Sequence, residues 1–310
     1  MNWCQMTIEV KIIEDTYHPQ VPSARITTFQ VYAPRFLLAE INTHRVLAKS
    51  AASSRAIPVS KRIQSVRDDP FIPSAFGKNK RGMQSDENLM DMEAVVAEQA
   101  WRGGITTALF TAEALDLMGV HKQLANRVLE PYAHYYGVIT ATEWDNFWAL
   151  RIGKAAQPEF QALASEMKRV YDANTPHATT NGWHIPYRND YGQDLSVALK
   201  VSAARCARVS YKTFDGKITL PEDDLKLCAQ LTEEFHMSPF DHPAQRDGII
   251  QKQNGIMRVQ RWFWANPEDH RQYWGHVPYR VQVEKSLGIV GRRSSFQPLA
   301  HDLVNIGKSV

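Results

Sequence analysis

The order of strand-like and helix-like segments is the feature that most constrains the fold of this chain. Residues Thr7–Glu14 and Thr27–Ala33 alternate apolar and polar side chains, the pattern of half-buried strands. Leu89–Trp101 and Ile105–Leu117 have helical spacing, and we expect Gly103-Gly104 to separate them. Strands and helices come in runs without βαβ alternation, and no GxGxxG segment follows a strand. The sequence therefore predicts an α+β domain, with helices around an antiparallel sheet, and not a Rossmann sheet.

A further helix is predicted to begin at Pro221, because proline fits the first turn and the acidic residues 222–224 face the positive end of the helix dipole. Its buried side would consist of Leu225, Cys228, Leu231 and Phe235.

Composition limits the possible classes of protein. The 310 residues are 44% hydrophobic and 22% charged, as in a soluble globular protein of one large or two ordinary domains. A net charge of +3 suits small anionic ligands and does not require nucleic acid. The three cysteines are far apart, so we expect neither disulfides nor a bound metal. Without a signal peptide or an apolar run of about 18 residues, we expect a cytoplasmic protein that does not enter the membrane.

One short segment gathers groups that suit phosphate. His44-Arg45 is followed, after seven residues, by Ser53-Ser54-Arg55. Arginine forks match phosphate oxygens in pairs, and serine hydroxyls complete such a cradle. A solvated basic loop is the simpler interpretation of this segment alone, so the prediction depends on the rest of the chain.

Four other sequence blocks, in two further parts of the chain, support the prediction. Residues 125–131 read Ala-Asn-Arg-Val-Leu-Glu-Pro, and residues 146–151 read Asn-Phe-Trp-Ala-Leu-Arg. Later, residues 204–211 read Ala-Arg-Cys-Ala-Arg-Val-Ser-Tyr, and residues 236–242 read His-Met-Ser-Pro-Phe-Asp-His. Together with His44-Arg45 and Ser53, these blocks resemble the motifs of the flavin-dependent thymidylate synthases. The corresponding family motifs are Arg-His-Arg-(seven residues)-Ser, Ala-Arg-x-x-Leu-Pro, Asn-Phe-x-x-Leu-Arg, Ala-Arg-Val-Ser-Tyr and His-x-(Ser/Thr)-Pro-Phe-Glu-His.

The order of the blocks differs from that of the family. The last two blocks normally precede the Arg-His-Arg signature, whereas here they follow it, so the chain resembles a circularly permuted member. Permutation is tolerated where the former termini lie close together on the surface. The resemblance covers Ile26 to His242, and it requires Ser238 and Asp241 to lie near His44 and Arg45.

We therefore expect a permuted catalytic unit over residues 1–242. Over residues 243–310 we expect a hairpin and an extension packed on the same domain. Gly248–Gln253 and Ile256–Trp262 flank Asn254-Gly255, which is a strong hairpin signal.

The resemblance implies transfer of a one-carbon unit from methylenetetrahydrofolate to C5 of dUMP, with FAD reduced by NADPH, in a homotetramer with sites at subunit interfaces. Arg151 would contact the uracil and stabilise negative charge that develops on it. The residues implied at the nucleotide are Glu40, Ser53, Ser54, Arg55, Arg127 and Arg151. Those implied at FAD are His44, Arg45, Asn146, Ser210, Ser238 and Asp241.

Some positions depart from the family pattern. Thr43 replaces the first signature arginine, Ala51 replaces a glutamate, and Glu130 interrupts the Leu-Pro pair. These changes leave open whether the product is methylated or hydroxymethylated. Cys206, the only cysteine inside a motif, is expected to be a packing residue and not a nucleophile.

Two alternatives remain. The tail interleaves basic and aromatic residues, as in proteins that bind single-stranded nucleic acid, although subunit interfaces have the same composition. The residues concerned are Arg258, Arg261, Trp262, Trp264, His270, Arg271, Tyr273, Trp274, Tyr279 and Arg280. The other alternative is a family member with only a structural role.

Overall fold

The computed structural model describes residues 7–179, 181–188, 194–209, 219–253 and 260–289. Its centre is a five-stranded sheet with the order β3-β4-β2-β1-β5. The strands are β1 (Glu9–His18), β2 (Val21–Pro34), β3 (Ala48–Ala51), β4 (His134–Ala141) and β5 (His177–Ala178). All neighbours pair antiparallel except β1 and β5. The α+β prediction is confirmed, and both predicted N-terminal strands are present with shifted ends.

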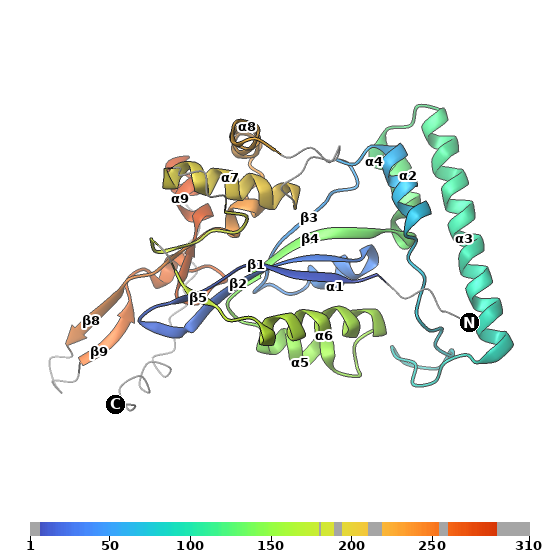
Figure 1. The fold of residues 1–310 in the computed structure, drawn as a ribbon, viewed down its shortest axis with the longest axis horizontal. Coiled ribbons are helices and arrows are strands. Elements are labelled where there is room, and N and C mark those ends of the chain that lie inside the picture. The colour runs from blue at the N-terminus through green and yellow to red at the C-terminus, as the bar shows by residue number, and fades with distance from the viewer. Residues whose placement is uncertain (1–6, 180, 189–193, 210–218, 254–259, 290–310) are drawn as a thin grey trace.

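Helices cover both faces of this sheet (Figure 1). Along β4, Ile139 belongs to the core formed with α5 (Asp145–Ile152) and α6 (Pro158–Ala173), whereas its neighbour Val138 packs with Cys206 of α7 (Leu195–Arg208). This follows from the alternation of side chains along a strand. The second layer also contains α8 (Pro221–Glu233) and α9 (Tyr279–Ser286), with a small sheet of β6 (Trp183–His184), β7 (Ala244–Arg246) and β10 (His276–Pro278).

A third group of helices lies at one end of the sheet: α2 (Val59–Asp68), α3 (Asp91–Leu117) and α4 (Lys122–Ala125), with the 3₁₀ helix η2 (Asn126–Tyr132). The predicted break at Gly103-Gly104 is wrong, because α3 runs through it. A Cβ atom on Gly104 would lie 2.5 Å from the Tyr132 hydroxyl, so this glycine allows close packing. Burial of Ile105, together with Ala108 and Ala112, offsets the cost of about 1 kcal/mol that a helical glycine carries.

The helix predicted from Pro221 is confirmed as α8, but the expected burial of Phe235 is wrong. The helix ends at Glu233, Phe235 has a φ of +56°, and its side chain is 64% exposed. Asp224 is buried instead, because it forms an ion pair with Arg205 of α7.

A continuous row of buried hydrogen bonds crosses the sheet. The row runs Thr16, His184, Thr28, Thr140, His242 and Ser50, with separations of 2.7–2.9 Å between successive polar atoms. We call it the Thr–His row. Burial lowers the pKa of His242 to about 3 and that of His184 well below its usual value, so both imidazoles are neutral. The row joins strands β1, β2, β4 and β3 to the segment after the 3₁₀ helix η3 (Ser238–Asp241), which packs against β3.

The hairpin prediction is confirmed by β8 (Ile249–Gln253) and β9 (Gln260–Trp264), which pair antiparallel. The second strand begins at Gln260, and the turn lies outside the described residues. Residue 242 is the expected end of the catalytic unit. In the small sheet, β7 lies after this residue and pairs with β6, which lies before it. None of the helices in the described ranges has the length and apolar character that a membrane span requires.

The aromatic and basic tail is largely used within the fold. Trp264 and Tyr273 are buried, and Arg271 and Arg280 form ion pairs with Glu284. Burial prevents Trp264 and Tyr273 from stacking on bases as single-strand binding requires, whereas Trp262 is 48% exposed. Arg258 lies outside the described residues.

Candidate functional site

The polar segment around residues 44–55 is divided by β3 into two parts. His44 and Arg45 precede the strand, and Ser53, Ser54 and Arg55 follow it. Four strand residues advance about 13 Å, so the segment does not form a single phosphate cradle. Each part joins side chains from distant elements, and the two resulting clusters are described in turn.

The first cluster consists of Glu40, His44 and Arg151, and we call it the Arg151 cluster. Glu40 lies on the short helix α1 (Leu38–Ile41), and Arg151 lies in the last turn of α5. Arg151 donates from Nε to His44 Nε2 over 2.8 Å and from Nη1 to Glu40 Oε2 over 2.6 Å. The guanidinium is thus held on two sides.

His44 acts here as a neutral acceptor. Burial, followed by the charges of Arg151 and Lys49, lowers the pKa of His44 to about 4. Because Nε2 accepts the hydrogen bond from Arg151, the single ring hydrogen of the neutral imidazole is assigned to Nδ1. His44 therefore orients Arg151 without adding a second positive charge.

Aromatic rings complete the surroundings of Arg151. The Arg151 guanidinium lies over the Phe160 ring, 4.5 Å from its centre, and Phe147 meets His44 edge-on with 5.1 Å between ring centres. The Arg151 side chain is 17% exposed. A fixed and partly dry cation of this kind can stabilise negative charge that develops on a carbonyl oxygen.

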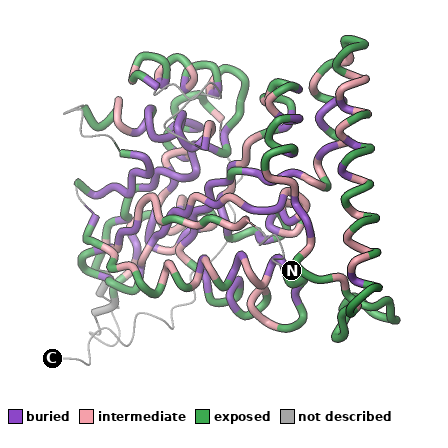
Figure 2. The backbone as a smooth tube through the Cα atoms, turned by 45° about the vertical axis from the view of Figure 1, so that its right-hand side comes forward, coloured by how far each residue is buried: buried purple, intermediate pink, exposed green. Residues whose placement is uncertain are grey.

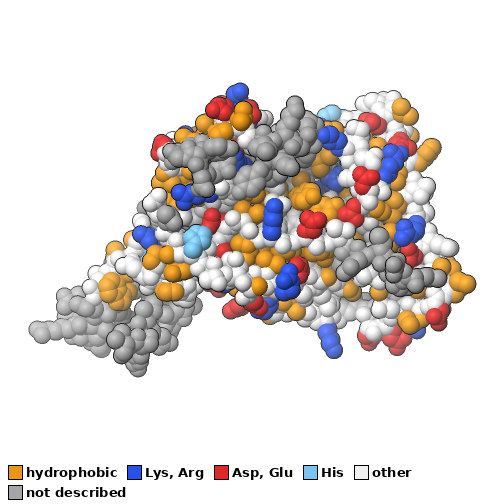
Figure 3. Space-filling view, in the orientation of Figure 1, with side chains coloured by type: hydrophobic (Ala, Val, Ile, Leu, Met, Phe, Trp, Pro, Cys, Tyr) orange, Lys and Arg blue, Asp and Glu red, His pale blue; other side chains and the backbone are white. Residues whose placement is uncertain are grey.

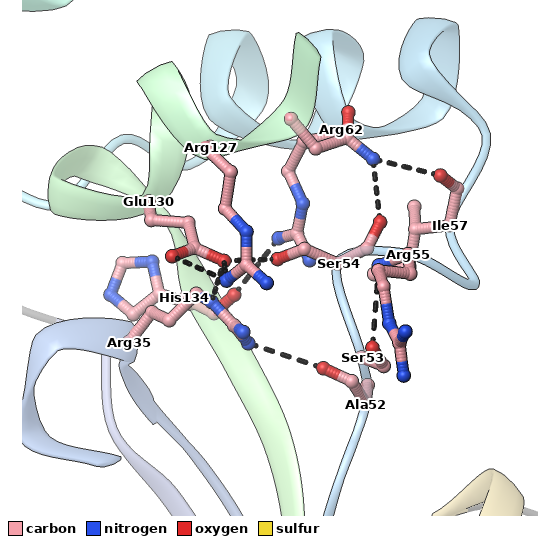
Figure 4. A network of polar contacts seen from close by, with 11 residues as sticks. Arg35, Ala52, Ser53, Ser54, Arg55, Ile57, Arg62, Arg127, Glu130 and His134 are labelled. Carbon is pink, nitrogen blue, oxygen red and sulfur yellow. Dashed lines mark hydrogen bonds and ion pairs between the residues drawn. The ribbon is translucent and has the colours of Figure 1, made fainter. Parts of the chain in front are cut away.

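The second cluster consists of Arg35, Ser54, Arg62, Arg127 and Glu130, and we call it the Ser54 cluster (Figure 4). Arg35 follows β2, Arg62 comes from α2, and Arg127 and Glu130 both lie on η2. Residues three apart are eclipsed on a 3₁₀ helix, which brings Arg127 over Glu130. Asn126 fixes the loop that carries Ser54, since its Nδ2 donates to the carbonyls of Ser54 and Ile57 over 2.7 and 2.9 Å.

Glu130 is the centre of the Ser54 cluster. Its Oε1 accepts from Ser54 Oγ over 2.5 Å, from Arg35 Nε over 3.0 Å and from Arg127 Nη1 over 3.0 Å. Burial raises the pKa of Glu130, but the Ser54 hydrogen bond and the arginines outweigh burial and lower it overall. Glu130 is therefore a carboxylate at neutral pH.

Arg62 is the most deeply buried member, with 3% of the residue exposed. Its Nη1 donates to the His134 carbonyl over 3.1 Å, whereas Nε and Nη2 have no hydrogen-bond partner in the part of the chain that the structure describes. Burial and the neighbouring Arg35 lower the pKa of Arg62 to about 10, so it remains charged. The cluster thus holds three cations and one anion.

The other residues implied at the nucleotide lie beside the Ser54 cluster. Ser53 and Arg55 are exposed, and Ser53 Oγ accepts from the Arg55 backbone N–H over 3.3 Å. The Arg55 side chain has no hydrogen-bond partner in the described ranges, and Figure 4 shows it next to Ser53. Sequence reasoning missed Arg35 and Arg62. The available signal was an arginine at position 62 among the apolar positions of an amphipathic helix, which is a costly place for a cation.

The residues implied at FAD differ from one another in their exposure and in their hydrogen-bond partners. Arg45, Asn146 and Ser238 are exposed, and their side chains have no hydrogen-bond partner within the described residues. Asp241 is buried, accepts from Arg280 over 3.2 Å, and has its pKa raised to about 6 by burial. Thr43 donates to the Glu40 carbonyl over 2.6 Å, so it supplies no cation. Ser210 lies outside the described residues.

Cys206 is fully buried, as expected for a packing residue, and burial raises the pKa of its thiol. Among the described residues, no group of three His, Cys, Asp or Glu side chains is arranged to hold a metal ion.

Comparison with known proteins gives the family. The family model described as "Thymidylate synthase complementing protein" matches residues 11–177, whereas no curated protein matches. Solved structures of the UMP/dUMP methylase PolB from Streptomyces cacaoi are similar to this chain. The complex with 5-Br UMP has 16% identity, a TM-score of 0.46, and coverage of 54% of this chain and 89% of the other. The complex with 5-Br dUMP has 13% identity, a TM-score of 0.44, and coverage of 54% and 90%. Because the family model spans more than half of the chain and every residue of both clusters, this protein belongs to the thymidylate synthase complementing protein family, the flavin-dependent thymidylate synthases.

Proposed function

We propose that this protein transfers a one-carbon unit from methylenetetrahydrofolate to C5 of dUMP, with FAD reduced by NADPH, and that it forms dTMP. The observation that carries the proposal is the hydrogen bond from Arg151 to His44, which joins two family motifs across 107 residues. It fixes the one cation that the family resemblance assigns to the uracil.

Arg151 is proposed to bind a uracil carbonyl. Its Nε and Nη1 atoms are held by His44 and Glu40, and Nη2 has no hydrogen-bond partner among the described residues. An oriented donor that meets developing negative charge contributes about 3–4 kcal/mol to a barrier. Because the guanidinium is already oriented, little reorganisation is needed when the substrate binds.

The Ser54 cluster, with Ser53 and Arg55, is proposed to bind the 5′-phosphate. Bidentate arginine pairs and a serine hydroxyl match its oxygens. The surplus of positive charge in the cluster supports an anionic ligand.

The residues implied at FAD were tested for their fit to this cofactor. Arg45, Asn146 and Ser238 present exposed donors without partners in the described ranges, which suits the phosphates and ring of a flavin nucleotide. The packing of η3 against β3 supports a site that Ser238 shares with Arg45. Asp241 fits less well, because Arg280 engages its carboxylate. When bound, FAD would supply the hydride chemistry, whereas the protein binds and orients the nucleotide.

The active assembly is proposed to be a homotetramer in the cytoplasm. On α3, Val96, Phe110 and Leu117 are spaced by fourteen and seven residues, so they share one side of the helix. Phe110 and Leu117 are 71% and 90% exposed. Figure 2 shows the outward side of α3 as exposed, and Figure 3 shows hydrophobic side chains along this edge. An apolar stripe of this length supports burial against a second copy.

The deciding experiment is a product assay. The protein is incubated with dUMP, methylenetetrahydrofolate, FAD and NADPH, and the nucleotide is identified by mass. We expect dTMP, whereas 5-hydroxymethyl-dUMP would make the protein a hydroxymethylase. Unchanged dUMP from a folded, flavin-loaded sample would contradict the proposal. Light scattering that gives a monomer at micromolar concentration would contradict the tetramer.

A further inference from the structure

The Ser54 cluster carries more positive charge than its own residues neutralise. Arg35, Arg62 and Arg127 face the single carboxylate of Glu130, so three cations minus one anion leave +2. Burying charge without a partner is costly, and natural proteins compensate buried cations with anions. The described residues contribute one anion to the cluster, so the remaining charge favours an anionic ligand.

Arg62 gives an independent indication of such a ligand. Its Nε and Nη2 atoms are buried without a hydrogen-bond partner in the described part of the chain, and each unsatisfied buried N–H costs about 1–3 kcal/mol. Figure 4 shows the Arg62 side chain reaching from α2 to the region of Ser54 and Glu130. Buried polar groups without partners are rare, and a ligand is one reason for them to persist.

Glu130 occupies the donors that a phosphate would use. It accepts from Ser54, Arg35 and Arg127 at once, and these groups would bind phosphate oxygens in the same way. Its hold on Arg127 is weak, because the Arg127 side chain is 52% exposed and such pairs are worth about 0–1 kcal/mol. Arg127 can therefore exchange one anion for another at little cost.

We propose that Glu130 is an internal substitute for the ligand phosphate, which the incoming phosphate displaces, and that Arg62 is a specificity-determining residue that binds the displacing group. The nucleotide part of this inference rests on the proposed function, but the anion site itself does not. A carboxylate carries one negative charge and two oxygens, whereas a phosphomonoester carries about −1.5 to −2 charge and three free oxygens. Glu130 thus sets a threshold that favours terminal phosphomonoesters over less charged groups.

The test measures binding of inorganic phosphate, dUMP and deoxyuridine by calorimetry to the full-length protein. Glu130→Gln keeps the shape and the ability to accept hydrogen bonds but removes the charge. We expect this variant to bind inorganic phosphate and dUMP about tenfold more tightly, a change of about 1.4 kcal/mol, and deoxyuridine with unchanged affinity. Arg62→Met should weaken phosphate and dUMP by about tenfold or more, the loss expected for a charge-assisted hydrogen bond.

Glu113→Gln is the matched control, because Glu113 forms an ion pair with Arg67 in which both side chains are more than a third exposed, and it has no contact with Glu130 among the described residues. Thermal unfolding of each variant separates loss of binding from loss of fold. Unchanged or weaker phosphate binding by a folded Glu130→Gln protein would overturn the proposal, since Glu130 would then be a structural counter-ion. A third outcome separates the two proposals. If Glu130→Gln binds inorganic phosphate about tenfold more tightly than wild type does, but neither protein binds dUMP more tightly than inorganic phosphate, then Glu130 is an internal substitute for phosphate and the proposed nucleotide function fails.

Discussion

The two clusters that flank β3 both contain arginine, but they differ in how its charge and its N–H groups are paired. In the Arg151 cluster, one arginine is balanced by one carboxylate and held by a neutral histidine. In the Ser54 cluster, three arginines share one carboxylate, and the most buried of them has two nitrogens, Nε and Nη2, without a hydrogen-bond partner in the described residues. The charges of the first arrangement balance without a ligand, whereas those of the second leave a surplus of positive charge. In the proposed function, Arg151 orients the uracil and the Ser54 cluster binds the phosphate, so the two roles belong to different segments of the chain.

The largest expected effect on activity comes from a substitution in the Arg151 cluster. Arg151→Lys keeps the charge but loses the planar fork that donates to His44 and Glu40, so turnover should fall by about 10- to 1,000-fold. Steady-state kinetics on flavin-loaded enzyme measure the loss. Arg169→Lys on the exposed side of α6 is the control, because Arg169 pairs only with Glu166 in the described residues. Full turnover by Arg151→Lys would remove the Arg151 cluster from the chemistry.

A mixing experiment tests whether one nucleotide uses both clusters across a subunit boundary. At dUMP concentrations below the wild-type KM, Arg151→Ala and Arg55→Ala are each expected to be impaired as pure oligomers. If each site takes Arg151 from one chain and Arg55 from another, random mixed oligomers contain intact sites, and about a quarter of wild-type activity should return. Refolded or co-expressed mixtures provide the measurement. Activity equal to the average of the two pure variants would mean that both clusters of one chain serve the same site.

Arg55→Ala alone should have a smaller effect of a different kind. A phosphate contact is made equally in the ground state and the transition state, so KM for dUMP should rise by about tenfold while kcat changes little. Initial rates at varied dUMP give the two constants. A fall in kcat at unchanged KM would place Arg55 with the groups that act on chemistry and would end the contrast between the clusters.

The smallest effect concerns pH. The pKa of His44 is about 4 in the fold and about 6.5 when unfolded, so the unfolded chain binds more protons between these values and stability falls as pH falls through that window. His44→Asn should make the unfolding free energy less dependent on pH there, by at most about 1.4 kcal/mol per pH unit. Glu130 has a lowered pKa, so Glu130→Gln should change the dependence only below about pH 4.5, as the carboxylate protonates. Denaturant titrations from pH 3 to 8 cover both windows, and identical profiles for wild type and His44→Asn would contradict a neutral His44.

Local pattern predicted much of this fold. Alternation located β1 and β2, and the Asn-Gly signal located the β8–β9 hairpin. Local pattern failed at Gly104, because this glycine serves close packing against Tyr132 and does not end the helix. It also failed at Phe235, because α8 ends two residues before this position. The family resemblance assigned His44 to FAD and Arg151 to the uracil, and it did not predict the hydrogen bond that joins the two side chains. No local pattern joins Arg35, Arg62 and Glu130, because their proximity depends on how α2 and η2 pack at the end of the sheet.

The Thr–His row has a direction. Each neutral imidazole and each hydroxyl in it carries one hydrogen, so the bonds can all point from Thr16 toward Ser50 or all point back. A mixed pair of tautomers breaks the row at Thr28 and Thr140, either because one of the two hydroxyl hydrogens has no acceptor in the row or because no hydrogen lies between the two oxygens. In the first order His184 and His242 both carry hydrogen on Nε2, and in the second both carry it on Nδ1. An unbroken row therefore requires two rings 58 residues apart in the sequence to share one tautomer, and a change in both rings reverses the polarity of a line of hydrogen bonds that crosses four strands of the central sheet.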